Sequence, residues 1–378
     1  MVNSKLLNVR LIVLAIFLVV AIVVTIVVMQ KPQPEPTPVA PAPAPAVTKV
    51  GFIYPGPLAD FGWNFSHDQG RQYLESKLPW VETLKVERVP PGADLERVVR
   101  EMVQQGVKVI FAPSFGYSAL MPGIAAQHPN VIFMQGAGFG SGPNLGTYFG
   151  RIEDVRFLTG MVAGLKTRTN RLGFVAAHPF SEAIIGLNAF TLGARLVNPK
   201  VTVQVVWSGT WFDPAKEREA ALSLIEAGAD VIGQYQDSPA SQQAAQDRGV
   251  FGVGDNSDLR SFAPNATLVG PVWNWGPFYV EMMENIRDGT WKPEQYRWPM
   301  PDIVDLSPFN EALVPKEIQD KVMAKRQEII DGKFNIFAGP IKDQAGAIRV
   351  PAGTIMTVDE MRGMYWLVEG VIGSLPAR

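Results

Sequence analysis

The residues best suited to chemistry in this chain are aromatic. They cluster in short segments that each follow an apolar run: PGPLADFGWN, PSFGY, SGTWFD and VWNWGPFY. Offset stacking of rings contributes about 0.5–1.5 kcal/mol beyond the burial of area, and it orients a flat ligand. Any one of these rings could instead pack in a core, but the group favours a site for a flat, aromatic ligand. The candidates are Trp63, Phe115, Tyr117, Trp211 and Trp275.

Three carboxylates lie in comparable segments, Asp237 in YQDSPAS and Asp255 and Asp258 in GVGDNSD. A carboxylate there could accept a ring N–H, an exocyclic amine or sugar hydroxyls, and such a charge-assisted bond contributes roughly 1.5–3 kcal/mol. The alternative for each is a helix N-cap or a solvated loop acid. We expect ligand contact from Asp237 and Asp258 rather than from Asp255.

Several common site types do not fit the sequence. The histidines, His67, His128 and His178, have no second ligand at metal-binding spacing, so a zinc site is not expected. His67 could reach a ligand one helical turn after Trp63, although a helix-surface position is the commoner outcome. The glycine run GAGFGSGPNLG lacks the G-x-G-x-x-G spacing of a dinucleotide site, and no nucleophile and base stand in a recognisable context. We therefore expect neither an enzyme nor a cofactor.

Two successive series of short apolar runs and helical patterns position these residues. The first begins at KVGFIY and extends to LGTYFG at Leu145–Gly150, and the second begins at RLGFVAA and extends to VFGVGD. Such alternation predicts an α/β fold of two doubly wound lobes, in which ligands bind beyond the carboxyl ends of the parallel strands. Asp213 before Pro214 predicts one helix start, and Gly228 its end.

The expected division of the globular part is lobe 1 at 48–150 plus 271–298 and lobe 2 at 151–270 plus 299–337. Hinge crossings are expected near Gly150, Pro271 and Pro299. A C-terminal extension, 338–378, contains GTIMTVDEMRGMYWLVEGVIG, which could form an amphipathic helix that docks on a lobe.

The N-terminal part indicates a membrane tether. The uncharged run Leu11–Gln30 matches the roughly 20 residues that cross a bilayer, whereas a signal-peptide core usually has about 7–15. Lys5 and Arg10 predict a cytoplasmic tail at 1–10, and the proline-rich linker 31–47 predicts an extended spacer of about 50 Å. A long cleaved signal is the alternative. The prediction is a single-pass cell-membrane protein whose binding domain is extracytoplasmic. The net charge of −2, with no basic stripe, argues against nucleic acid.

The segments DFGWNFSHDQG, SFGY, GFVAA, LVNP, WFDPAKE, GADVI and WGPFY occur in this order over roughly Val50–Asn335. With them the chain resembles the basic membrane protein family of ABC-transporter substrate-binding proteins. The resemblance implies the type I periplasmic-binding-protein fold, with two lobes joined by three crossings. It also implies capture of a purine base or nucleoside and its delivery to ABC permease subunits. Most members are lipoproteins anchored on a cysteine, and this chain has no cysteine.

The resemblance also suggests site residues. The family pattern D-x-x-F-N is matched from Asp60 to Asn64, with Trp63 in the place of the stacking phenylalanine, and Trp211 matches the second-lobe aromatic. The ribose-binding G-V-D-x-D segment is matched only loosely by 252–258, and the tryptophan-rich motifs are similar to a branch that binds adenine-like bases. The full expected set is Phe61, Trp63, Asn64, Phe115, Tyr117, Trp211, Asp237, Asp258 and Trp275. A ligand-binding sensor that signals to a partner protein, or a nucleoside hydrolase, is the alternative function.

Overall fold

The computed structural model describes residues 9, 12–22, 25 and 47–376, and it divides the chain into two units at Ala46 and Val47. In the first unit, residues 12–22 are helical and exposed. Within the described residues no helix is both long and apolar enough to cross a membrane. The rest of the predicted anchor Leu11–Gln30, the predicted tail apart from residue 9, and the linker up to Ala46 lie outside the described residues.

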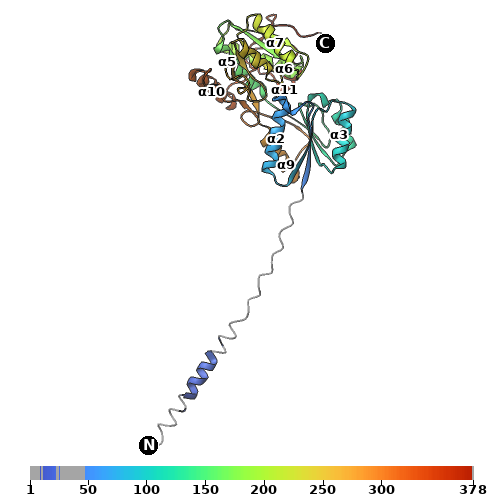
Figure 1. The fold of residues 1–378 in the computed structure, drawn as a ribbon, viewed down its shortest axis with the longest axis vertical. Coiled ribbons are helices and arrows are strands. Elements are labelled where there is room, and N and C mark those ends of the chain that lie inside the picture. The colour runs from blue at the N-terminus through green and yellow to red at the C-terminus, as the bar shows by residue number, and fades with distance from the viewer. Residues whose placement is uncertain (1–8, 10–11, 23–24, 26–46, 377–378) are drawn as a thin grey trace. The chain divides into compact units, whose positions relative to one another are not determined.

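The second unit contains two parallel sheets, and the first forms the lobe that we call lobe 1 (Figure 1). Its strand order is β12-β5-β4-β3-β1-β2. The strands are β1 (Thr48–Ile53), β2 (Val81–Val86), β3 (Val109–Pro113), β4 (Ile132–Gly136), β5 (Leu145–Gly150) and β12 (Gln295–Trp298). Helices α2 (Trp63–Lys77) and α9 (Trp275–Arg287) cover one face, and α3 (Ala93–Gln104) covers the other. The lobe also contains α4 (Met121–Gln127).

The second sheet forms lobe 2, with strand order β10-β9-β8-β6-β7-β16. Its strands are β6 (Arg171–Ala176), β7 (Thr202–Trp207), β8 (Val231–Tyr235), β9 (Phe251–Val253), β10 (Thr267–Val269) and β16 (Val371–Ile372). Its helices are α5 (Ile152–Lys166), α6 (Ser181–Val197), α7 (Pro214–Glu226), α8 (Ala240–Asp247) and α10 (Lys316–Ile330). The expected α/β fold with two parallel sheets is confirmed.

The chain passes between the lobes after β5, between β10 and α9, and after β12. The last two passages run antiparallel as a two-stranded ribbon, in which β11 (Pro271–Trp273) pairs with β13 (Val304–Leu306). These positions coincide with the sites expected near Gly150, Pro271 and Pro299. Few strands link the lobes, so we expect hinge bending at this ribbon to open and close the space between them.

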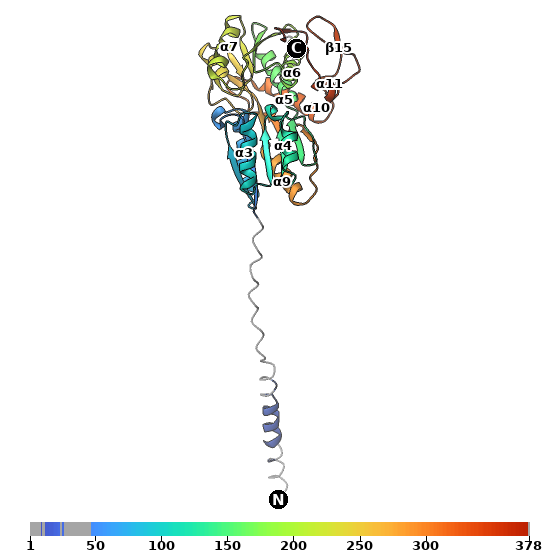
Figure 2. The same cartoon turned by 90° about the vertical axis from the view of Figure 1, so that its right-hand side faces the viewer.

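The C-terminal extension is not the amphipathic helix that the sequence suggested. It forms a hairpin of β14 (Ile341–Lys342) and β15 (Ile348–Val350), then the short α11 (Val358–Arg362), and ends with β16 at the edge of lobe 2 (Figure 2). Helix α11 stops at Gly363, and Gly370 has a φ of +96° that no helix permits. The side chain of Asn188 on α6 fixes the extension, since it donates to Trp366 O at 2.9 Å.

Candidate ligand-binding site

A cavity of about 500 Å³ lies between the lobes, within the size range of small-molecule sites. Its wall is formed mostly by the segments that follow β1, β2, β3, β4, β6, β7, β8 and β9, as expected for a cleft at the carboxyl ends of parallel strands. The wall is rich in aromatic side chains. They are Trp63, Phe115, Phe149, Phe180, Trp211, Phe212 and Tyr235.

Trp63 is positioned by the start of α2. The buried carboxylate of Asp60 accepts hydrogen bonds from the backbone N–H groups of Gly62 at 2.9 Å, Asn64 at 3.0 Å and Phe65 at 3.0 Å. It thereby satisfies N–H groups that the first helical turn leaves unpaired. The indole N–H of Trp63 donates to Pro113 O at 2.8 Å, which ties the ring to the end of β3.

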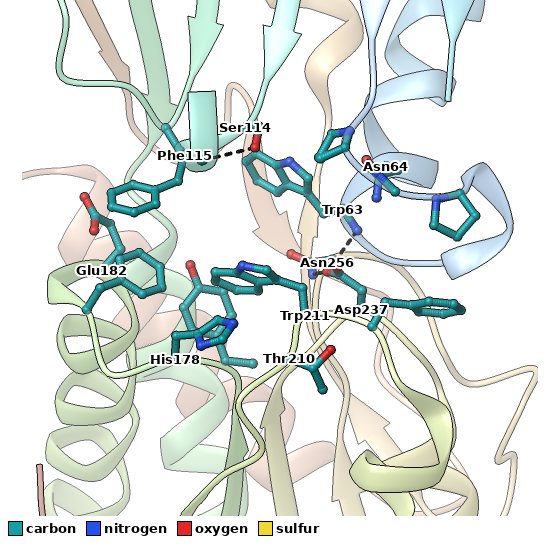
Figure 3. Close-up of a pocket in the computed structure, with 18 of the residues that line it drawn as sticks. Trp63, Asn64, Ser114, Phe115, His178, Glu182, Thr210, Trp211, Asp237 and Asn256 are labelled. Atoms are coloured by element: carbon teal, nitrogen blue, oxygen red, sulfur yellow. Dashed lines mark hydrogen bonds between the residues drawn. The ribbon is translucent and has the colours of Figure 1, made fainter. Parts of the chain in front are cut away.

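Trp211 enters the cavity from lobe 2. Its ring makes edge contacts with His178, Phe180 and Tyr235, with centroid separations of 5.6, 5.4 and 5.6 Å. In Figure 3 the Trp63 and Trp211 rings reach the cavity from opposite sides. Two indoles held at their edges and facing the same space can accept a flat ring between them.

Asp237 lies where the lobes touch, and it is 5% exposed. Its Oδ1 accepts hydrogen bonds from the Trp63 backbone N–H at 3.3 Å and from Asn256 Nδ2 at 2.9 Å. Burial raises the pKa of Asp237 well above its ordinary value, and the neighbouring carboxylate of Asp60 raises it further. The carboxylate therefore joins the α2 N-terminus of lobe 1 to lobe 2.

Ligand affinity should fall as the pH rises above about 4. Contact between the lobes buries Asp237 and raises its pKa, so closure binds protons, and loss of those protons opposes closure. The ordinary aspartate pKa is about 3.9, so the weakening begins above that value. Calorimetric titration across this range measures it. Asp237→Asn should flatten the profile, and a wild-type affinity independent of pH would contradict the argument.

Gly62→Ala should weaken ligand binding, because it opposes closure. A Cβ atom at Gly62 would lie 2.4 Å from Asp237 O in the other lobe, which is too close for contact. Such overpacking typically costs about 1–3 kcal/mol, or roughly 5- to 150-fold in affinity. Gly123→Ala on α4 is the matched control, since its Cβ would meet no atom within 4 Å. Equal affinities for the two variants would show that this contact does not limit closure.

Five of the nine expected residues line the cavity, namely Trp63, Asn64, Phe115, Trp211 and Asp237. The other four do not. Tyr117 is fully buried in lobe 1, where its hydroxyl donates to Val89 O at 2.6 Å. Trp275 is 1% exposed and stacks on His67 at 4.3 Å. It also packs edge-on against Trp63 at 5.6 Å, so it supports Trp63 within lobe 1.

Phe61 and Asp258 lie outside the cavity because other partners hold them. Phe61 is 37% exposed and packs on Phe262 of lobe 2, with ring centroids 4.7 Å apart. Asp258 forms an ion pair with Arg260 at 2.6 Å, and the hydrogen bond from that guanidinium lowers the pKa of Asp258. Both residues belong to loops beside the cleft rather than to its wall.

His67 is neither on a helix surface nor in the cavity wall. It is fully buried, its Nδ1 lies 2.5 Å from the Tyr279 hydroxyl, and burial lowers its pKa well below the ordinary value. The ring is therefore neutral and packs in the core of lobe 1. Within the described residues no group of three or more side chains could hold a metal ion.

Asp255, for which ligand contact was expected less than for Asp237 and Asp258, pairs with Arg156, a residue that no sequence motif indicated. The guanidinium Nη2 lies 2.9 and 3.0 Å from the two carboxylate oxygens, and both side chains are buried. Burial raises the pKa of Asp255 to about 6 although Arg156 opposes the shift. The guanidinium also lies 3.7 Å from the centroid of the Tyr235 ring, so the ion pair supports a wall residue.

Further wall residues were absent from the expected set. The segment after β6 supplies His178, Phe180 and Glu182. The rule that ligands bind beyond the carboxyl ends of parallel strands, here called the strand-end rule, could have found them. Phe149 lies within β5 rather than after it, so that rule could not. Asn256 has a φ of +63°, which turns its amide toward Asp237. Its segment follows β9 and could be predicted, but only the fold shows that its amide meets Asp237.

A two-lobed α/β protein with an aromatic cavity between its lobes has the architecture of the solute-binding proteins. The family model described as "Bmp: ABC transporter substrate-binding protein PnrA-like" matches residues 47–338. The chain is a member of this family, and the resemblance found in its sequence is confirmed. The family is one of substrate-binding proteins rather than of enzymes.

Two curated relatives are each 38% identical to the chain. A purine-binding protein of Brucella abortus aligns over 330 residues, 87% of this chain and 94% of that protein. A putative ABC transporter glucose-binding protein of Haloferax volcanii aligns over 288 residues, 76% of this chain and 73% of that protein. The names of these two relatives state different ligands, so family membership alone does not determine the ligand class.

Solved structures share the fold at low identity. A solute-binding protein from Conexibacter woesei has a TM-score of 0.63 at 20% identity and covers 76% of this chain and 98% of its own. A transcriptional activator of the comK gene from Bacillus halodurans has a TM-score of 0.67 at 24% identity and covers 76% and 99%. These likenesses establish the architecture of the two lobes.

Proposed function

We propose that this protein captures a purine base or nucleoside, with adenine-like bases favoured, and delivers it to the permease of an ABC importer. The observation that carries the proposal is the pair of indoles, Trp63 and Trp211, which reach one cavity from opposite lobes (Figure 3). Closure of the lobes would bring the rings onto both faces of a planar ligand. The purine-binding relative from Brucella abortus supports the same ligand class.

The chemistry of the wall favours a purine over a sugar. A sugar needs several hydrogen-bonding partners, yet many polar groups of the wall are already engaged within the protein. Asn64 Nδ2 donates to Asp60, Asn256 Oδ1 accepts from the Trp273 indole, and the Ser114 hydroxyl accepts from Gly116 N–H. A wall with many rings and a few free polar side chains, Glu182 among them, suits a flat aromatic ligand with polar edges.

The proposed contacts divide by role. Trp63 and Trp211 stack on the ligand, Phe115 walls the cavity, and Asn64 and Asp237 stand at the end opposite Glu182. Phe61, Tyr117, Asp258 and Trp275 act indirectly, through the loops and the packing that hold these residues. The domain would work outside the cytoplasmic membrane, held there by the segment Leu11–Gln30 and the linker 31–47.

Uptake measurements test the transport function. Cells that lack this protein should lose most of their uptake of radiolabelled adenine at low external concentration and keep their uptake of glucose. The wild-type gene should restore adenine uptake, and a gene carrying Trp211→Ala should not. Normal purine uptake in cells without the protein would argue for the sensor role. Conversion of a nucleoside to its base by the purified chain would argue for the hydrolase.

A further inference from the structure

Glu182 is a wall residue with unused capacity to bind a ligand. It lies in the first turn of α6, is partly buried and lines the cavity. Figure 3 places it beside Phe115, at the end of the cavity remote from Asp237, with Trp63 and Trp211 between the two acids. A ligand stacked between the indoles would thus present one edge toward each carboxyl group.

The partners of Glu182 leave part of its carboxylate unsatisfied. It accepts a hydrogen bond from the Ser181 hydroxyl at 3.0 Å and one from its own backbone N–H. An ionised carboxylate can accept about four. Among the described residues, no cationic nitrogen forms an ion pair with Glu182 within 4.0 Å, because the nearby Arg297 binds Glu153 at 2.5 Å and Arg362 binds Asp359 at 3.1 Å.

The other acid of the cavity is differently placed. Asp237 already accepts from the Trp63 N–H of the opposite lobe and from Asn256 Nδ2, so it holds the lobes together. Burial raises the pKa of Glu182, while Arg297 and Arg362 oppose the shift from a distance. Glu182 is therefore an acid that faces the cavity with long-range cationic support and few donors of its own.

We propose that Glu182 selects ligands with an exocyclic amino group, because its carboxylate accepts an N–H from that group at the end of the purine remote from Asp237. The inference rests on the proposed purine function and names the ligand subclass. An ionised carboxylate only accepts hydrogen bonds, so a carbonyl or a methyl group in the same place would leave it desolvated and unpaired. Amino purines should thus bind more tightly than their close analogues.

The test compares adenine with 6-methylpurine, which has a methyl group of similar size in place of the amine. The full chain in lipid nanodiscs is titrated by calorimetry. Wild type should bind adenine about 10- to 100-fold more tightly than 6-methylpurine. Glu182→Met, which has no acceptor oxygen, should bring the ratio close to one by weakening adenine alone. Glu182→Gln should give an intermediate ratio, and Glu219→Met on the exposed surface of α7 should keep the wild-type ratio.

Three results would overturn the proposal: equal wild-type affinities for the two purines, an unchanged ratio in Glu182→Met, or collapse of the ratio in Asp237→Asn instead. Thermal unfolding verifies that each variant is folded. If Glu182→Met does not fold, Glu182→Gln and the two wild-type titrations still decide the matter. Failure of the proposed function has a different signature, since wild type would then bind neither purine.

Discussion

Trp211→Ala should weaken adenine binding by about 30- to 300-fold, or roughly 2–3.5 kcal/mol. The substitution removes one of the two indoles that face the cavity, and with it both the stacking and the exclusion of water on one face of the ligand. Trp211→Phe should recover a large part of the loss, because a smaller ring still stacks. Calorimetric titration of the full chain measures both variants.

Trp207→Ala is the matched control for this prediction. Trp207 belongs to the same lobe, but its indole N–H donates to Ser374 O at 3.2 Å, and it is not part of the cavity wall. The affinity of the Trp207→Ala variant for adenine should stay within about threefold of the wild-type affinity, or roughly 0.7 kcal/mol. The sandwich between Trp63 and Trp211 would be wrong if Trp211→Ala and Trp207→Ala had the same affinity.

Arg156→Met should destabilise the protein by about 3–5 kcal/mol. It leaves the carboxylate of Asp255 buried without its partner and removes the cation that lies over Tyr235. The double variant Arg156→Met/Asp255→Asn should recover at least half of the loss, because it also removes the unpaired charge. Urea denaturation followed by circular dichroism gives the free energy of unfolding.

The exposed ion pair of Arg218 with Asp247, at 2.8 Å, is the control for burial. Their side chains are 43% and 54% exposed, and such pairs contribute about 0–1 kcal/mol. Arg218→Met should therefore be nearly neutral. Similar losses for Arg156→Met and Arg218→Met would mean that burial does not set the contribution of the Arg156–Asp255 pair.

Local signals predicted much of the fold. The pair Asp213 and Pro214 predicted the start of α7, and in the structure the Asp213 side chain accepts from Lys216 N–H at 3.2 Å, with Pro214 in the first turn. Such caps depend on neighbouring residues, so they can be read from sequence. The extension was less predictable, because β16 forms by pairing with β7, about 170 residues earlier in the chain.

The site was predictable at the level of segments but not of individual side chains. Phe115 and Tyr117 share one short turn, yet Phe115 lines the cavity and Tyr117 points into the core. The strand-end rule places the backbone of a segment and leaves the direction of each side chain open. Arg156 could not be found at all, because its partner is 99 residues away and only the fold brings them together.

Calorimetric titration of the ligand-stripped full chain with adenine, adenosine, guanosine, hypoxanthine and glucose tests the central claim most directly. The account predicts micromolar or tighter binding of at least one purine, or about −8 kcal/mol, with no measurable heat from glucose. Binding of glucose without binding of any purine would contradict it, and the cavity between Trp63 and Trp211 would then belong to a sugar-binding protein.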